Sequence, residues 1–238
     1  MNLIFILLQI NQTVIDTTSG LPPVVTGEDR MSLLELLLKG GPLMVPLVIM
    51  SIIAVYIFIE RYLTIKKSTK EEADFMKQIR DFVLNGNIEA AKSLCSASQN
   101  PIARMTEKGV SRIGKPVKNI EAAIEGVGKL EIYKLERSVG TLASIAGVAP
   151  MVGFLGTVTG MITAFYNLSK AGNNIETSML AGGIYEALVT TVGGLVVGIF
   201  AMICYNVLVG MIGRVVYKME LTAMEFMDLL QEPAEKIN

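Results

Sequence analysis

The sequence predicts an all-α integral membrane protein with three transmembrane helices, of which the second and third extend far into the cytoplasm. Of its 238 residues, 51% are hydrophobic and 18% are charged, whereas soluble domains carry roughly 25% charged residues. Between Arg137 and Arg214 only Lys170, Glu176 and Glu186 are charged. So long a stretch could not form a water-exposed surface, and we therefore expect it to lie in the bilayer.

Two segments precede the first span. Residues 1–30 contain one short apolar run and then a polar, proline-containing stretch. We expect a periplasmic N-terminal tail, with an atypical cleaved signal peptide as the alternative. Residues 31–41 are rich in leucine and end at Gly40 and Gly41, which predicts an interfacial amphipathic helix.

The first transmembrane helix is predicted over residues 42–65. Its uncharged core, residues 43–59, holds 17 residues, which at about 1.5 Å per residue just cross the hydrocarbon layer. Residues 66–116 are polar with helical periodicity, and Asn87 and the Asn100 and Pro101 pair are helix-start signals. A helical cytoplasmic region is therefore expected there.

Two long helices follow, each with one further span. The predicted helices, residues 117–169 and 177–231, are each a little over 50 residues long, or roughly 80 Å, against a hydrocarbon core of about 30 Å. Both must project far out of the membrane on one side. The turn signals in residues 170–176 join them as an antiparallel pair, and a short tail at 232–238 contains Pro233.

The distribution of positive charge predicts the orientation. Of 21 Lys and Arg residues, 18 lie between the first and second spans or after the third. The other three are Arg30, Lys39 and Lys170. Because short loops rich in Lys and Arg stay in the cytoplasm, we expect the N-terminus and the 170–176 turn outside, and the 66–116 region and the C-terminus inside.

Glu186 is the only acidic residue inside the apolar core of a predicted span. A charged group in hydrocarbon costs at least about 2.5 kcal/mol, so Glu186 should face a bundle interior or a wet cavity, where it can take and release protons. The alternative is a neutral Glu186 that hydrogen-bonds between helices as a packing contact. Thr190 lies one turn further on the same face, whereas Thr191 is rotated away but can still line a pore.

Glycines follow one side of each of the last two spans. Their G-x-x-x-G spacing lets membrane helices approach closely, but it is common enough to support only a tightly packed bundle. These glycines are Gly153, Gly156 and Gly160 in the second span and Gly194 and Gly198 in the third. Pro150 either kinks the second span or marks a bend where it enters the membrane.

Several functional classes lack the residues they need. There is no His, and the two cysteines, Cys95 and Cys204, are more than a hundred residues apart, so zinc spacings and His-dependent triads are missing. There is no phosphate loop and no basic patch interleaved with aromatic residues. We expect no catalytic site, no metal, no cofactor and no nucleic acid. The Lys and Arg residues are interpreted as a solvated face beneath anionic lipids.

Two segments resemble the motifs of a known family. Residues 149–161 read APMVGFLGTVTGM and residues 183–195 read GIYEALVTTVGGL. They closely resemble, in this order, the second-span and third-span motifs of the MotA/TolQ/ExbB proton channel family, and Tyr205 and Asn206 fit as well. The resemblance covers roughly residues 31–220. Three spans with an outside N-terminus resemble ExbB, with TolQ next, rather than the four-span flagellar stator subunits.

The resemblance implies a homopentameric bundle around a central pore in the bacterial inner membrane. It implies that an ExbD-like or TolR-like single-span partner enters the pore. Proton flow would then drive TonB-dependent energy transduction and transport, or the Tol–Pal system. Carried over residue by residue, the pathway positions are Glu186, Thr157 and Thr191. Helix geometry alone favours Thr190 over Thr191, and both stay candidates.

Two other classes of function stay open beside the channel. One is a non-conducting membrane scaffold in which Glu186 is a packing contact. The other is an intramembrane enzyme, which is disfavoured because the chain has no His and no Ser or Asp paired deep in a span. The motifs do not separate an ExbB-like role from a TolQ-like role.

The positive-charge distribution predicts the outcome of cysteine labelling. In intact cells, Asn11→Cys and Asn174→Cys should react with a membrane-impermeant thiol reagent, whereas Asn85→Cys and Glu235→Cys should not. The unsubstituted chain gives the background from its own two cysteines. Labelling of Asn85→Cys in intact cells would reverse the orientation.

Overall fold

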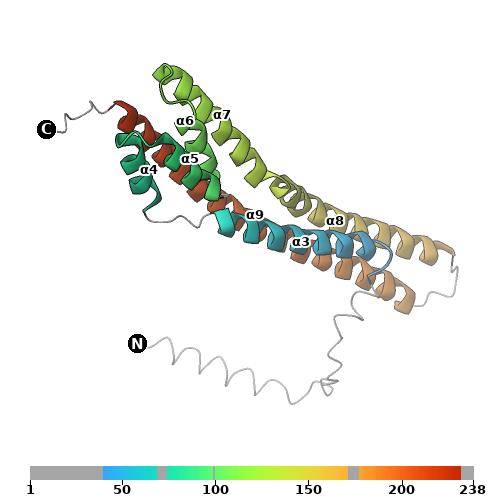
Figure 1. Cartoon of the computed structure of the whole chain (residues 1–238). Coiled ribbons are helices and arrows are strands. Elements are labelled where there is room, and N and C mark those ends of the chain that lie inside the picture. The colour runs from blue at the N-terminus through green and yellow to red at the C-terminus, as the bar shows by residue number, and fades with distance from the viewer. Residues whose placement is uncertain (1–39, 69–73, 99, 171–176, 232–238) are drawn as a thin grey trace, which may run out of the picture. The chain divides into compact units, whose positions relative to one another are not determined.

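The computed structural model describes residues 40–68, 74–98, 100–170 and 177–231, and every element within them is a helix (Figure 1). Three stretches of this part of the chain are long and apolar enough to cross a membrane. They are Met44–Ser68, Val117–Lys170 and Leu180–Gln231. The predicted all-α fold with three spans is confirmed.

Several predicted segments fall outside the described residues. They are the tails at 1–30 and 232–238, the 170–176 turn beyond Lys170, and the interfacial helix at 31–41 apart from Gly40 and Gly41.

Helix α3 (Met44–Ser68) is the first span, and it runs a few residues beyond the predicted 42–65 segment. One face of α3, which includes Leu47, Ala54 and Ile65, is fully buried against α8 and α9. On the opposite face Ile52 and Tyr56 are 64% and 68% exposed. Because apolar side chains on that face are largely exposed, it is the face that the bilayer can cover.

The region between the first and second spans contains three short helices, α4 (Phe75–Leu84), α5 (Ile88–Ala97) and α6 (Pro101–Val110). As predicted, the Asn87 side chain accepts a hydrogen bond from the Ala90 amide at 3.2 Å, and Asn100 accepts one from Ile102 at 3.2 Å. The predicted helical region is therefore confirmed. Inside it Cys95 is fully buried.

The Cys95 thiol is expected to be unreactive. Burial, together with the nearby charge of Glu107, raises the pKa of the Cys95 thiol to about 12. A thiol reacts as its thiolate, so Cys95 stays protonated and unreactive at physiological pH.

The single helix expected over residues 117–169 is wrong in one respect, because it is broken near its middle. Helix α7 (Val117–Glu136) ends and helix α8 (Val139–Lys170) begins on either side of Ser138, whose φ of 65° lies in the left-handed region. The α7 carbonyl of Lys134 accepts a hydrogen bond from Nη1 of Arg61 at 3.2 Å instead of from the next helical turn. A side chain of the first span thus caps the end of α7.

Helix α9 (Thr177–Gln231) is continuous, as predicted, and packs antiparallel along α8 (Figure 1). A Cβ on Gly194 would lie 2.8 Å from the Gly153 Cα, and one on Gly198 would lie 2.6 Å from the Pro150 ring. Pro150 therefore sits inside α8 without ending it. Such distances leave no room for any side chain, so the two backbones touch here.

Small residues of α8 and α9 meet in antiparallel order, so that residue numbers rise along α8 as they fall along α9. A Cβ on Gly156 would overlap Thr190, one on Gly160 would lie 2.9 Å from the Ala187 Cβ, and one on Gly183 would lie 2.7 Å from the Ala164 Cβ. The five glycines named from the sequence all lie in this contact between α8 and α9, which we call the glycine seam.

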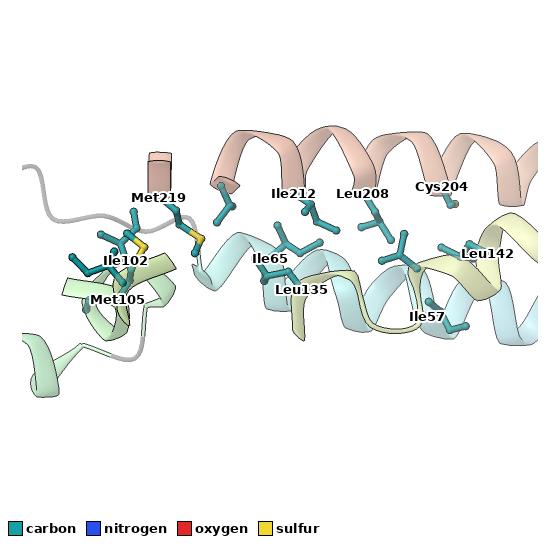
Figure 2. Close-up of a cluster of buried hydrophobic side chains, with 14 of the residues drawn as sticks. Ile57, Ile65, Ile102, Met105, Leu135, Leu142, Cys204, Leu208, Ile212 and Met219 are labelled. Carbon is teal, nitrogen blue, oxygen red and sulfur yellow. The ribbon is translucent and has the colours of Figure 1, made fainter. Parts of the chain in front are cut away.

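Buried apolar side chains tie the remaining helices to α9, as Figure 2 shows. Leu208 and Ile212 of α9 pack near Ile65 of α3 and Leu135 of α7. Further along, Met219 meets Met105 of α6. Helix α9 thus contributes buried side chains both to the core between the spans and to the core of the short helices.

The glycine seam predicts that Gly194→Ala and Gly210→Ala have opposite effects on stability. Both lie within α9, where Ala is favoured over Gly by about 1 kcal/mol, and a Cβ at Gly210 meets nothing within 4 Å. At Gly194 it would meet α8 backbone at 2.6 Å, an overpacking that typically costs about 1–3 kcal/mol. Thermal unfolding in detergent should show a lower midpoint for Gly194→Ala only. Equal midpoints would contradict the close approach of the helices.

Candidate functional site

Glu186 lines a cleft of about 420 Å³ between α8, α9 and residues 40–43, which precede α3. Its side chain is half-buried. The twelve lining residues include five with polar side chains. These five are Thr159, Thr163, Asn167, Glu186 and Thr190. The carboxyl group therefore faces a polar space rather than a close-packed apolar one, as expected of an acid within a span.

Thr190 closes the inner end of the cleft. Thr190 is 1% exposed. Its single hydroxyl hydrogen is shared between two carbonyl oxygens, that of Gly40 at 2.9 Å and that of Glu186 at 2.8 Å. The contact with Gly40 joins residues 150 positions apart. Thr190 thus holds the turn before α3 against α9, one helical turn from Glu186.

Gly41 brings that turn against the Glu186 carboxyl. Its φ of +68° is in the left-handed region, and a Cβ added there would overlap Glu186 Oε1. Non-helical backbone at membrane depth is tolerated where it is buried in protein or lines a cavity. From the sequence, Gly40 and Gly41 were interpreted only as a helix end. The signal that was missed is a glycine pair directly before a span.

The other two threonines lie elsewhere. The Thr191 hydroxyl donates to the Gly153 carbonyl at 2.9 Å, across the glycine seam. The Thr157 hydroxyl donates to the Phe154 carbonyl of its own helix at 2.6 Å. Thr157 lines a separate open hollow of about 520 Å³, in which it is the only polar residue among five.

The structure therefore brings Glu186 and Thr190 together and leaves Thr157 outside their cleft. Thr159, Thr163 and Asn167 belong to the cleft, and the sequence analysis did not select them. Their spacing of four residues along one helix is the signal that could have found them. Among the described residues, no group of His, Cys, Asp or Glu could hold a metal ion.

A family model described as the MotA/TolQ/ExbB proton channel family matches residues 97–221, a range that contains Glu186 and all three threonines. The biopolymer transport protein ExbB-like 1 of Synechocystis is 32% identical over 181 residues, which cover 75% of this chain and 71% of the relative. The chain belongs to the MotA/TolQ/ExbB proton channel family. The resemblance of residues 149–161 and 183–195 to that family is thus confirmed.

Other relatives bear the names ExbB and TolQ. The biopolymer transport protein ExbB of Neisseria meningitidis is 25% identical over 189 residues, covering 71% of this chain and 84% of the relative. The Tol-Pal system protein TolQ of Haemophilus influenzae is 45% identical over 76 residues, covering 32% of this chain and 33% of the relative. The family description and the relatives' names are those of channel and transport proteins rather than enzymes.

The position of Gly41 predicts that a small substitution there acts on Glu186. Gly41→Ala and Gly86→Ala meet similar backbone strain, because their φ angles are +68° and +69°, but a Cβ at Gly86 meets nothing within 4 Å. Gly41→Ala should change the rate at which dicyclohexylcarbodiimide modifies Glu186 by at least about threefold, whereas Gly86→Ala should not. Peptide mass spectrometry measures the modification. Identical modification rates in both variants would show that the turn at Gly41 does not affect the Glu186 carboxyl.

Proposed function

We propose that this chain is the channel-forming subunit of an ExbB-like motor of the bacterial inner membrane, driven by the proton-motive force. With an ExbD-like single-span partner, it would couple proton flow to TonB-dependent energy transduction and transport across the outer membrane. The observation that carries this proposal is Glu186, the one acid within the apolar part of α8 and α9, placed in a polar cleft. An acid that binds and releases protons in such a place serves as a relay.

An ExbB-like role is favoured over a TolQ-like role by coverage. ExbB-named relatives from Synechocystis and Neisseria align over 71–75% of this chain, whereas the TolQ alignment covers 32% of it. A TolQ-like subunit of the Tol–Pal system is the alternative, with a TolR-like partner in the same place. The positive-charge distribution supports a periplasmic N-terminus and a cytoplasmic C-terminus.

We further propose a homopentamer whose pore is lined by α8 and α9. The hollow beside Thr157 supports this, because its other lining residues are Val158, Met161, Ile162 and Phe165. An apolar surface with a single hydroxyl suits a transmembrane helix of a partner better than a water column. Thr157 would then face the partner, Glu186 would lie on the opposite side of the glycine seam, and Thr191 would lie between them.

The proposal predicts proton flux that needs both the partner and Glu186. In liposomes with an imposed pH gradient, the chain alone should match empty vesicles, because the cleft ends at Thr190 and one acid cannot span about 30 Å of hydrocarbon. Addition of the single-span partner should raise the flux, and Glu186→Gln should abolish the rise. Glu225→Gln, an exposed change on the same helix, is the matched control.

Three outcomes would contradict this mechanism. Unchanged flux in Glu186→Gln would mean that Glu186 is a packing contact. If the assembled complex carries no flux at all, the chain is a non-conducting scaffold. Rapid Glu186-dependent flux from the chain alone would show a self-sufficient channel and remove the need for a partner acid.

A further inference from the structure

The cleft at Glu186 has a polar wall along α8. Thr159, Thr163 and Asn167 are spaced by four residues, so they form one stripe on the helix. At about 1.5 Å per residue, the stripe is about 12 Å long. It ends one turn before Lys170, whose ammonium group lies 4.5 Å from the Tyr166 ring. A lysine in the last turn marks the level at which α8 reaches water.

The hydroxyl groups of the stripe are arranged to accept hydrogen bonds. The Thr163 hydroxyl donates to the Thr159 carbonyl at 2.9 Å, and the Thr159 hydroxyl donates to the Leu155 carbonyl at 2.9 Å. With the hydrogen committed to the helix, each oxygen keeps lone pairs that a water molecule can use. The Asn167 amide both donates and accepts. A roomy polar cavity with several such partners holds water.

The cleft itself, at about 420 Å³, has space for that water. Residues 40–43 form its third side, and Gly156, Gly160 and Gly183 line its base, where α8 and α9 are in close contact. The Glu186 carboxyl lies against Gly41, beside that third side. The apolar hollow at Thr157 offers no comparable route for water, because only one of its five lining residues, Thr157, is polar.

We propose that this cleft is a water-filled access path along which protons reach Glu186 from the side of the membrane where α8 ends. Thr159, Thr163 and Asn167 hold the water in the path and position it, whereas Glu186 is the group that takes the proton. This inference rests on the proposed function, because only a relay acid needs a supply of protons. Its test is independent of that function, because access of water to the cleft is measured without any proton flux.

The test uses the full chain with its partner in native membranes and a membrane-impermeant methanethiosulfonate, which reacts with the thiolate that forms only in water. Thr163→Cys and Asn167→Cys should react at least about tenfold faster than Ile52→Cys when the reagent is added on the side of the α8–α9 turn. Ile52 is 64% exposed but lies on the apolar face of α3. In the unsubstituted chain, a water-soluble carbodiimide should modify Glu186.

The path is overturned if both cysteines react no faster than Ile52→Cys, or if Glu186 reacts with dicyclohexylcarbodiimide only. A flux measurement separates the two proposals. Thr163→Val combined with Asn167→Leu should lower partner-dependent flux at least about fivefold, whereas Thr141→Val on the same helix should not. Flux that needs Glu186 but ignores the double variant refutes the path alone. Fast labelling in a complex without flux refutes the motor alone.

Discussion

The close approach of α8 and α9 at Gly153 and Gly194 sets the geometry of everything around Glu186. Because the backbones touch there, the register of the antiparallel pair is fixed, and every residue one or two turns away has a defined partner. Thr190 therefore meets Gly156, and Glu186 falls in the cleft whose base is lined by Gly156, Gly160 and Gly183. A larger residue in the glycine seam would move the carboxyl along with the helix.

A second constraint joins the first span to helices α6 and α7. Arg61 is 9% exposed, pairs with Glu60 at 2.8 Å, and caps α7 at Lys134. The Lys134 side chain in turn pairs at 2.6 Å with Glu131, which is 6% exposed. A charge so deeply buried is retained only with partners, and Arg104 of α6 supplies another at 3.3 Å. The break in the long helix thus lies inside a network that spans three elements.

The sequence predicted what local chemistry decides. The lengths of α3 and α9, the caps at Asn87 and Asn100, and the isolation of Glu186 in an apolar stretch all follow from neighbouring residues. The break at Ser138 could not be predicted, because neither proline nor glycine marks it and the group that caps it lies 73 positions away. The glycine pair at Gly40 and Gly41 marks a turn, but its contact with Glu186 could not be predicted, because that contact depends on the packing of α3 on α9.

The arrangement places Glu186 and Thr157 in different cavities, although the resemblance implies that both belong to one pathway. Glu186 and Thr157 lie on opposite sides of the glycine seam, and the Thr191 hydroxyl inside that seam is already bonded to Gly153. Backbones in contact leave no room for water between them. A proton at Glu186 is therefore separated from the apolar hollow by a dry barrier. Within this chain, water could connect Glu186 with the hollow only if a movement opened the seam.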